Sequence, residues 1–114
     1  MVYRLGHVAE LRNLPTTTLA AWQWLHEQLY LLDEQYGAER NSLEDDGGYV
    51  LFMERGTAWS ELQRYGDFDG KLCESIEQRG EWCSILYLLN NEFSISIVMA
   101  VDDLPIVLKK ELEA

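Results

Sequence analysis

Residues 82–101, WCSILYLLNNEFSISIVMAV, contain the clearest tertiary signal in the chain. Two β-prone runs, 82–89 and 93–101, flank Asn90-Asn91-Glu92, and asparagine tolerates the positive φ that a tight hairpin turn requires. Apolar side chains alternate along the second run: Phe93, Ile95, Ile97, Met99 and Val101. Ser94 and Ser96 fall on the other face, as in a strand that is covered on one face only. We therefore expect an antiparallel hairpin with helices on one side.

Upstream of the hairpin, the strongest helical pattern runs from about residue 18 to residue 36. It begins after Pro15, at threonines that can cap a helix, and it ends before Gly37. Five side chains with a 3-4-3-4 spacing form one stripe along it: Trp22, Leu25, Leu29, Leu32 and Tyr36. We expect this stripe to face the sheet. Trp24 and Leu31 fall to one side of the stripe, so the apolar arc is wider than one contact requires.

The remaining elements are short. The pattern predicts an edge strand at 2–8, a central strand at 49–53, helices at about 58–65 and 71–79, and a last helix from Asp102 and Asp103 through Leu112. The expected fold class is α+β, as one domain over residues 1–114. It has two layers, with a mainly antiparallel sheet of three to four strands and with a long N-terminal helix and short helices packed on one face.

The composition excludes several classes of function. Twenty acidic residues against nine basic ones give a formal net charge of −11. Binding to a nucleic-acid backbone or to an anionic membrane depends on Lys and Arg clusters, so both are disfavoured. No run approaches the roughly 18 apolar residues of a membrane span, and the first residues lack the apolar core of a signal peptide. We therefore expect a soluble, cytoplasmic protein.

The residues that could carry chemistry form no recognised motif. Asp67-Phe68-Asp69-Gly70 suggests a calcium loop, but the register places Tyr65 and Ile76 where ligands belong, so a turn is expected. His7 and His26 are far apart, as are Cys73 and Cys83, and neither pair has metal-ligand spacing. We expect no catalytic residue, no metal and no cofactor. A Cys–His pair that meets only in space stays open.

The candidate interface lies on the first helix and the acidic segment that follows it. Residues 27–46 hold seven carboxylates and one basic residue, Arg40. An exposed Trp–Leu ridge beside this charge would mark a partner site. The candidate interface residues are Trp24, Leu31, Asp33, Glu34, Glu44, Asp45 and Asp46. The alternatives are that a short helix covers the ridge, and that the acidic loop is only solvated.

Three segments carry a resemblance: LEDDGGYVLF at 43–52, GTAW at 56–59 and CSILYLLNN at 83–91. With them the chain resembles small uncharacterised acidic proteins encoded on mobile elements of anaerobic gut bacteria. The resemblance covers about half of the chain. It implies an accessory cytoplasmic protein of bacterial origin.

These observations favour a non-catalytic interaction protein that docks a protein partner or itself. The alternative is an acidic inhibitor, either an immunity-type protein or a DNA mimic, that blocks a basic cleft. A small hydrolase is the third hypothesis, and it requires a pocket where titratable groups converge.

Overall fold

The computed structural model describes residues 1–36, 48–69, 72–88 and 94–113, without the side chains of residues 33, 35 and 36. Along these segments the elements are β1 (Val2–Leu5), η1 (Val8–Asn13), α1 (Leu19–Tyr36), β2 (Tyr49–Met53), η2 (Trp59–Arg64), β3 (Cys73–Arg79), β4 (Trp82–Leu88), β5 (Ser94–Ala100), η3 (Val101–Asp103) and α2 (Ile106–Glu113), where η marks a 3-10 helix. None of the described helices is long and apolar enough to span a membrane.

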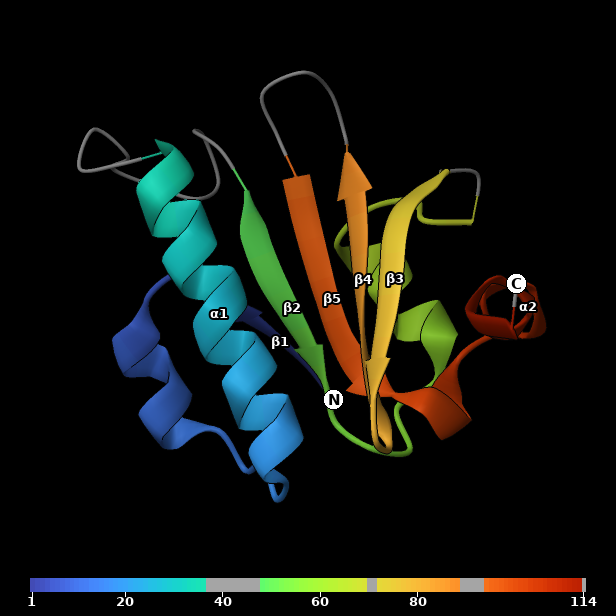
Figure 1. Ribbon diagram of the computed structural model, residues 1–114, viewed down its shortest axis with the longest axis horizontal. Coiled ribbons are helices and arrows are strands. Elements are labelled where there is room, and N and C mark those ends of the chain that lie inside the picture. Colours follow the sequence, from blue (N-terminus) through green and yellow to red (C-terminus); the bar gives the residue numbers. More distant parts are fainter. Residues whose placement is uncertain (37–47, 70–71, 89–93, 114) are drawn as a thin grey trace.

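The strands form one mixed sheet in the order β1-β2-β5-β4-β3. β2 and β5 run parallel, with Val50 opposite Ser96, and the other neighbouring strands run antiparallel. Helices α1 and η1 lie against one face of the sheet, and η2 and α2 lie against the other (Figure 1). The described chain therefore has three layers, with the sheet between two layers of helices.

The predicted architecture is wrong, although the chain does combine helices with a sheet. The sheet has five strands rather than three to four, it is mixed, and helices cover both of its faces. The long helix is not N-terminal, because β1 and η1 precede α1. The error has a physical reason: the parallel pairing of β2 with β5 joins segments far apart in the chain, and such a pairing leaves no local pattern in the sequence.

The predicted hairpin is confirmed as the antiparallel pair of β4 and β5, although its turn and Phe93 lie outside the described residues. Ser94 and Ser96 do not face solvent, because they are only 6% and 3% exposed. Helix α1 covers their face, where the hydroxyl oxygens of Ser84 and Ser96 lie 3.3 Å apart, within hydrogen-bond distance. Such small side chains allow a helix to approach the sheet closely, so the serine face is a second buried face.

Helix α1 is present where the sequence predicts it, but its buried stripe is rotated. The fully buried side chains on it are Ala21, Trp24, Leu25, Leu29 and Leu32. Trp22 is only half-buried, and η1 packs beside α1 with Leu11 in the core. Trp24 is therefore a core residue, and the expectation that it is surplus is wrong. Trp22 and Trp24 lie on opposite flanks of one apolar arc, so the spacing alone does not decide which of them is buried.

The short N-terminal and central elements agree with the sequence pattern in type and place. β1 is an edge strand, and β2 lies inside the sheet between β1 and β5. The helix expected at about 58–65 is observed as the 3-10 helix η2, with Leu62 buried in the core. Of these elements, η2 contributes Trp59 to a wall of the site described below.

The helix predicted at about 71–79 is wrong, since this segment forms β3 at the edge of the sheet. Its apolar residues are few and only partly buried, so the sequence has no strong period of either kind. Charged side chains at Glu74, Glu77 and Arg79 are typical of an edge strand, where they discourage pairing with other chains. Asp69, which precedes this segment, accepts hydrogen bonds from two side chains of η2.

The last helix begins later than predicted. Asp102 and Asp103 do not cap it, because the carboxylate of Asp102 binds Arg55 and that of Asp103 accepts a bond of 2.8 Å from the backbone N–H of Gly56. α2 starts after Pro105, whose fixed φ suits the entrance to a helix. The predicted stripe does dock, with Leu104 and Leu108 buried.

Candidate functional site

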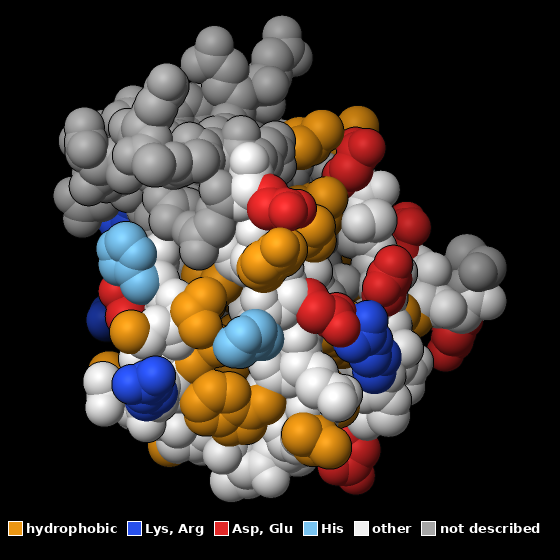
Figure 2. Space-filling model, turned by 60° about the vertical axis from the view of Figure 1, so that its left-hand side comes forward, with side chains coloured by type: hydrophobic (Ala, Val, Ile, Leu, Met, Phe, Trp, Pro, Cys, Tyr) orange, Lys and Arg blue, Asp and Glu red, His pale blue; other side chains and the backbone are white. Residues whose placement is uncertain are grey.

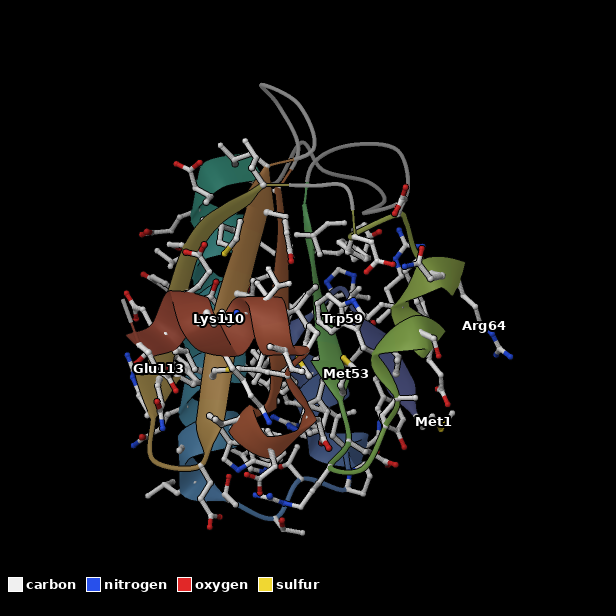
Figure 3. The ribbon with its side chains drawn as sticks, turned by 90° about the vertical axis from the view of Figure 1, so that its right-hand side faces the viewer. Met1, Met53, Trp59, Arg64, Lys110 and Glu113 are labelled. Atoms are coloured by element: carbon white, nitrogen blue, oxygen red, sulfur yellow. The ribbon has the colours of Figure 1, made fainter. Side chains whose placement is uncertain are left out.

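The aromatic pocket is a cavity of about 250 Å³ on the sheet face opposite α1. Its described walls come from η2, the segment after η2, β4 and the start of α2: Trp59, Phe68, Asp69, Tyr87, Pro105, Val107 and Leu108. In Figure 3, Trp59 lies between η2 and the near end of α2, while Lys110 and Glu113 lie farther along α2. Three of the described lining residues are aromatic and one carries a carboxylate, so the pocket combines apolar surface with a negative charge.

Asp69 is held in place by neutral donors. The indole N–H of Trp59 donates to its Oδ1 at 2.9 Å, and the side-chain amide of Gln63 donates to Oδ2 at 2.9 Å. The backbone N–H of Asp69 donates to Oδ1 of Asp67 at 3.2 Å, which makes the turn expected from the sequence. These donors orient the carboxylate without neutralising it, and each oxygen keeps room for a further donor.

The floor of the aromatic pocket is formed by Phe68 and Tyr87, each 2% exposed. Their ring centroids lie 5.3 Å apart with the planes inclined by 49°. Burial, helped by the nearby Cys73 and Asp69, raises the pKa of Tyr87 to about 12. At neutral pH the Tyr87 hydroxyl is therefore protonated and does not act as a base.

The structure does not bring a cysteine and a histidine together. Cys83 alternates with Ser84 on β4, so its thiol lies on the face opposite α1, and Cys73 pairs with Tyr87 of that same face. His26 is exposed on α1, and His7 is exposed just before η1 on the α1 side of the sheet. The Cys–His pair left open by the sequence is therefore excluded. No group of three or more His, Cys, Asp or Glu side chains among the described residues is arranged to hold a metal ion.

Both thiols are held in the protonated form. Burial raises the pKa of Cys83 to about 12, and it also raises the pKa of Cys73, with help from the charge of Glu111. Because the thiolate is the nucleophile, neither cysteine is activated for covalent chemistry. Neither cysteine is among the described wall residues of the aromatic pocket.

The raised pKa values of Cys83 and Tyr87 predict a loss of stability at alkaline pH. The folded state holds these two protons more tightly than the unfolded state, so the free energy of unfolding falls as pH rises from about 9 towards 12. Urea unfolding at several pH values between about 8 and 11 measures the fall. The variant Cys83→Ala/Tyr87→Phe should show a shallower fall than the natural chain, and an equal slope would contradict the assignment.

A second candidate site lies at the end of the seam between α1 and the sheet. Leu31 of α1 and Leu88 of β4 line a hollow of about 140 Å³, together with Leu32, Leu86 and other residues. Cys73 lies opposite Tyr87 in the antiparallel pair of β3 and β4. Extending this register by one residue places the backbone of Leu72 beside that of Leu88. We call Leu31, Leu72 and Leu88 the leucine cluster.

The leucine cluster is unusually exposed for side chains of its kind. Leu31 is 54% exposed, Leu72 92% and Leu88 51%. Figure 2 shows hydrophobic side chains gathered along this side of the molecule. Single exposed leucines are ordinary, but Leu31 and Leu88 share one hollow and Leu72 lies beside β4 in the sheet, so the three form an apolar patch of the kind that binds partners.

The described candidate interface residues differ in exposure. Trp24 is 1% exposed and contributes no surface, so its place in the interface is corrected. Leu31 and Glu34 are exposed. The side chain of Asp33 lies outside the described residues, as do Glu44, Asp45 and Asp46. Leu72 and Leu88 are not among the residues expected from the sequence, because the local pattern predicts a helix at Leu72 and an ordinary strand position at Leu88.

Comparisons of this chain with protein families, with curated proteins and with solved structures found no match. A function must therefore be argued from the aromatic pocket and the leucine cluster themselves.

Proposed function

We propose that this chain is a non-catalytic, cytoplasmic interaction protein of bacterial origin that binds a protein partner at the leucine cluster. The observation that carries the proposal is the hollow between α1 and β4 that the exposed Leu31 and Leu88 line, with the exposed Leu72 just before the neighbouring strand β3. Aliphatic side chains around a shallow hollow are the usual features of a surface that receives an apolar anchor from another protein.

The charge around the leucine cluster selects the kind of partner. Glu34 lies one helical turn after Leu31, and Glu74 and Glu77 are exposed on β3. Arg79, also on β3, is engaged by Glu27 at 2.9 Å. A partner with an apolar anchor flanked by Lys or Arg would complement this surface.

The overall charge disfavours a second copy as the occupant. Each chain carries a formal net charge of −11, so two copies that meet at this surface would repel one another. The same features also suit the alternative function, an acidic inhibitor of immunity type that covers a basic cleft. A DNA mimic fits less well, because phosphate mimicry uses charge alone and would leave the exposed leucines unexplained.

The test uses a defined probe, a fluorescent amphipathic peptide with one leucine-rich face and one lysine-rich face. Fluorescence anisotropy should show that Leu31→Glu/Leu88→Glu weakens binding at least about tenfold, since it places charge in the contact. The matched control is Leu19→Glu, which is 74% exposed on the same helix and about 18 Å away along its axis. It should bind within about twofold of the natural chain.

Two results would overturn the proposal. One is that Leu19→Glu weakens peptide binding as much as the double variant does, which would mean that the peptide is not bound specifically at the leucine cluster. The other is equal binding of a peptide whose lysines are replaced by glutamates, which would mean that charge plays no part. Circular dichroism of each variant establishes that it is folded before binding is compared.

A further inference from the structure

The aromatic pocket has a chemistry of its own, distinct from that of the leucine cluster. Leu31 and Leu88 of the cluster line the hollow on the α1 face of the sheet, and the aromatic pocket lies on the opposite face. We propose that the aromatic pocket binds a compact organic cation, an ammonium group that carries small alkyl substituents.

The first argument is the character of the walls. Trp59 supplies partly exposed aromatic surface above the buried rings of Phe68 and Tyr87, and aromatic rings attract a cation most strongly where water is displaced. Pro105, Val107 and Leu108 supply aliphatic surface for the alkyl substituents. Among the described wall residues, Asp69 is the one that offers carboxylate oxygens, and a metal ion needs several such ligands. The walls therefore favour an alkylated ammonium group over a metal ion.

The second argument is the sign of the charge. Among the described wall residues, Asp69 carries a carboxylate and none is a Lys or Arg. The amino-terminal end of α2 also borders the pocket and carries about half a positive charge, but the full charge of Asp69 exceeds it. The formal net charge of −11 further favours the approach of a cation.

The third argument is pre-organisation. The bonds from Trp59 and Gln63 hold both oxygens of Asp69 before any ligand arrives, and the Phe68 and Tyr87 rings are fixed by burial. Little side-chain freedom is lost on binding, which favours recognition of a small ligand. The volume of about 250 Å³ suits a group of this size rather than a larger cofactor.

The test compares choline with its neutral isostere 3,3-dimethylbutan-1-ol, which has the same shape without the charge. The reporter is the indole N–H signal of Trp59 in a nitrogen-15 NMR spectrum, assigned with Trp59→Phe, because this group bonds directly to Asp69. Choline should shift the signal with a dissociation constant in about the millimolar range, and the isostere should bind at least about tenfold more weakly.

The matched variants are Asp69→Asn and Glu113→Gln. Asp69→Asn keeps an acceptor for Trp59 but removes the charge, so it should weaken choline binding at least about tenfold. Glu113→Gln removes one charge from the exposed far end of α2 and should leave binding within about twofold. A further experiment compares a peptide that contains trimethyllysine with the same peptide containing unmodified lysine. It shows whether a protein side chain can also provide the alkylated ammonium group.

Equal binding of choline and its isostere would overturn the proposal, as would unchanged choline binding by Asp69→Asn or a failure of every ammonium probe to shift the Trp59 signal. Because choline and its isostere are compared on the natural chain, the proposal stays testable even if Asp69→Asn fails to fold. None of these outcomes bears on the leucine cluster.

Discussion

Trp24→Ala is expected to lower the free energy of unfolding by about 3–5 kcal/mol, the usual range for deletion of a buried tryptophan. Trp24 is 1% exposed at the interface between α1 and the sheet. The guanidinium of Arg79 lies 5.0 Å from its ring centroid and is itself paired with Glu27. Removing the indole would leave a cavity beneath α1 and would also remove the surface on which Arg79 rests. Urea unfolding followed by circular dichroism measures the loss.

The control is Trp22→Ala on the same helix. Trp22 is half-buried, so the same chemical deletion should cost less than about half as much. If Trp22→Ala were the costlier change, α1 would dock through the stripe expected from the sequence alone, and the rotated stripe described above would be wrong.

Gly48→Ala is expected to destabilise the chain by about 3 kcal/mol, at the upper end of the range for overpacking. A Cβ atom at this position would lie 2.2 Å from the backbone oxygen of Ser94 and 2.7 Å from Cδ2 of Leu32. The first of these belongs to the neighbouring parallel strand and cannot rotate away. The substitution would therefore push β2 from β5 or lift α1 from the serine face. Thermal and urea unfolding both report the effect.

Gly80→Ala provides the contrast. A Cβ at Gly80 meets nothing within 4 Å, but the φ of +60° strains an alanine, so a cost of about 1 kcal/mol is expected. An asparagine there should be better tolerated than alanine, because it adopts positive φ more readily. A Gly48→Ala variant as stable as Gly80→Ala would mean that α1 and β5 are not packed as closely as described.

Local patterns predicted the parts of the fold that depend on nearby residues. The alternation along residues 94–100 and the apolar run at 49–53 identify strands because side chains on a pleat repeat every two residues. The place of α1 follows from its period and its flanking threonines and glycine. Each of these features is confirmed.

The errors share a physical origin in tertiary contacts. Whether the face of Ser94 and Ser96 meets solvent or α1 depends on Gly48, Gln28 and Leu32, which lie elsewhere in the chain. The segment of β3 has weak periodicity and becomes a strand because β4 pairs with it.

The candidate sites were only partly predictable for a similar reason. Leu31 was identified from its helical phase, which is a local property. Leu72 and Leu88 join it only through the pairing of β3 with β4 and the packing of α1 on the serine face. The aromatic pocket gathers residues from 59 to 108, and its one local sign was the Asp67–Asp69 turn, which the sequence analysis assigned to turn formation.

The most direct test of the proposed function is to map where the basic amphipathic peptide binds. Backbone amide shifts in nitrogen-15 NMR should change on titration at residues 28–34, 72–77 and 84–88, which surround the leucine cluster. Residues 59–69 and 105–108 around the aromatic pocket, and the amino-terminal end of α1, should remain unchanged. Shifts centred on either of those regions, with the leucine cluster unaffected, would contradict the account.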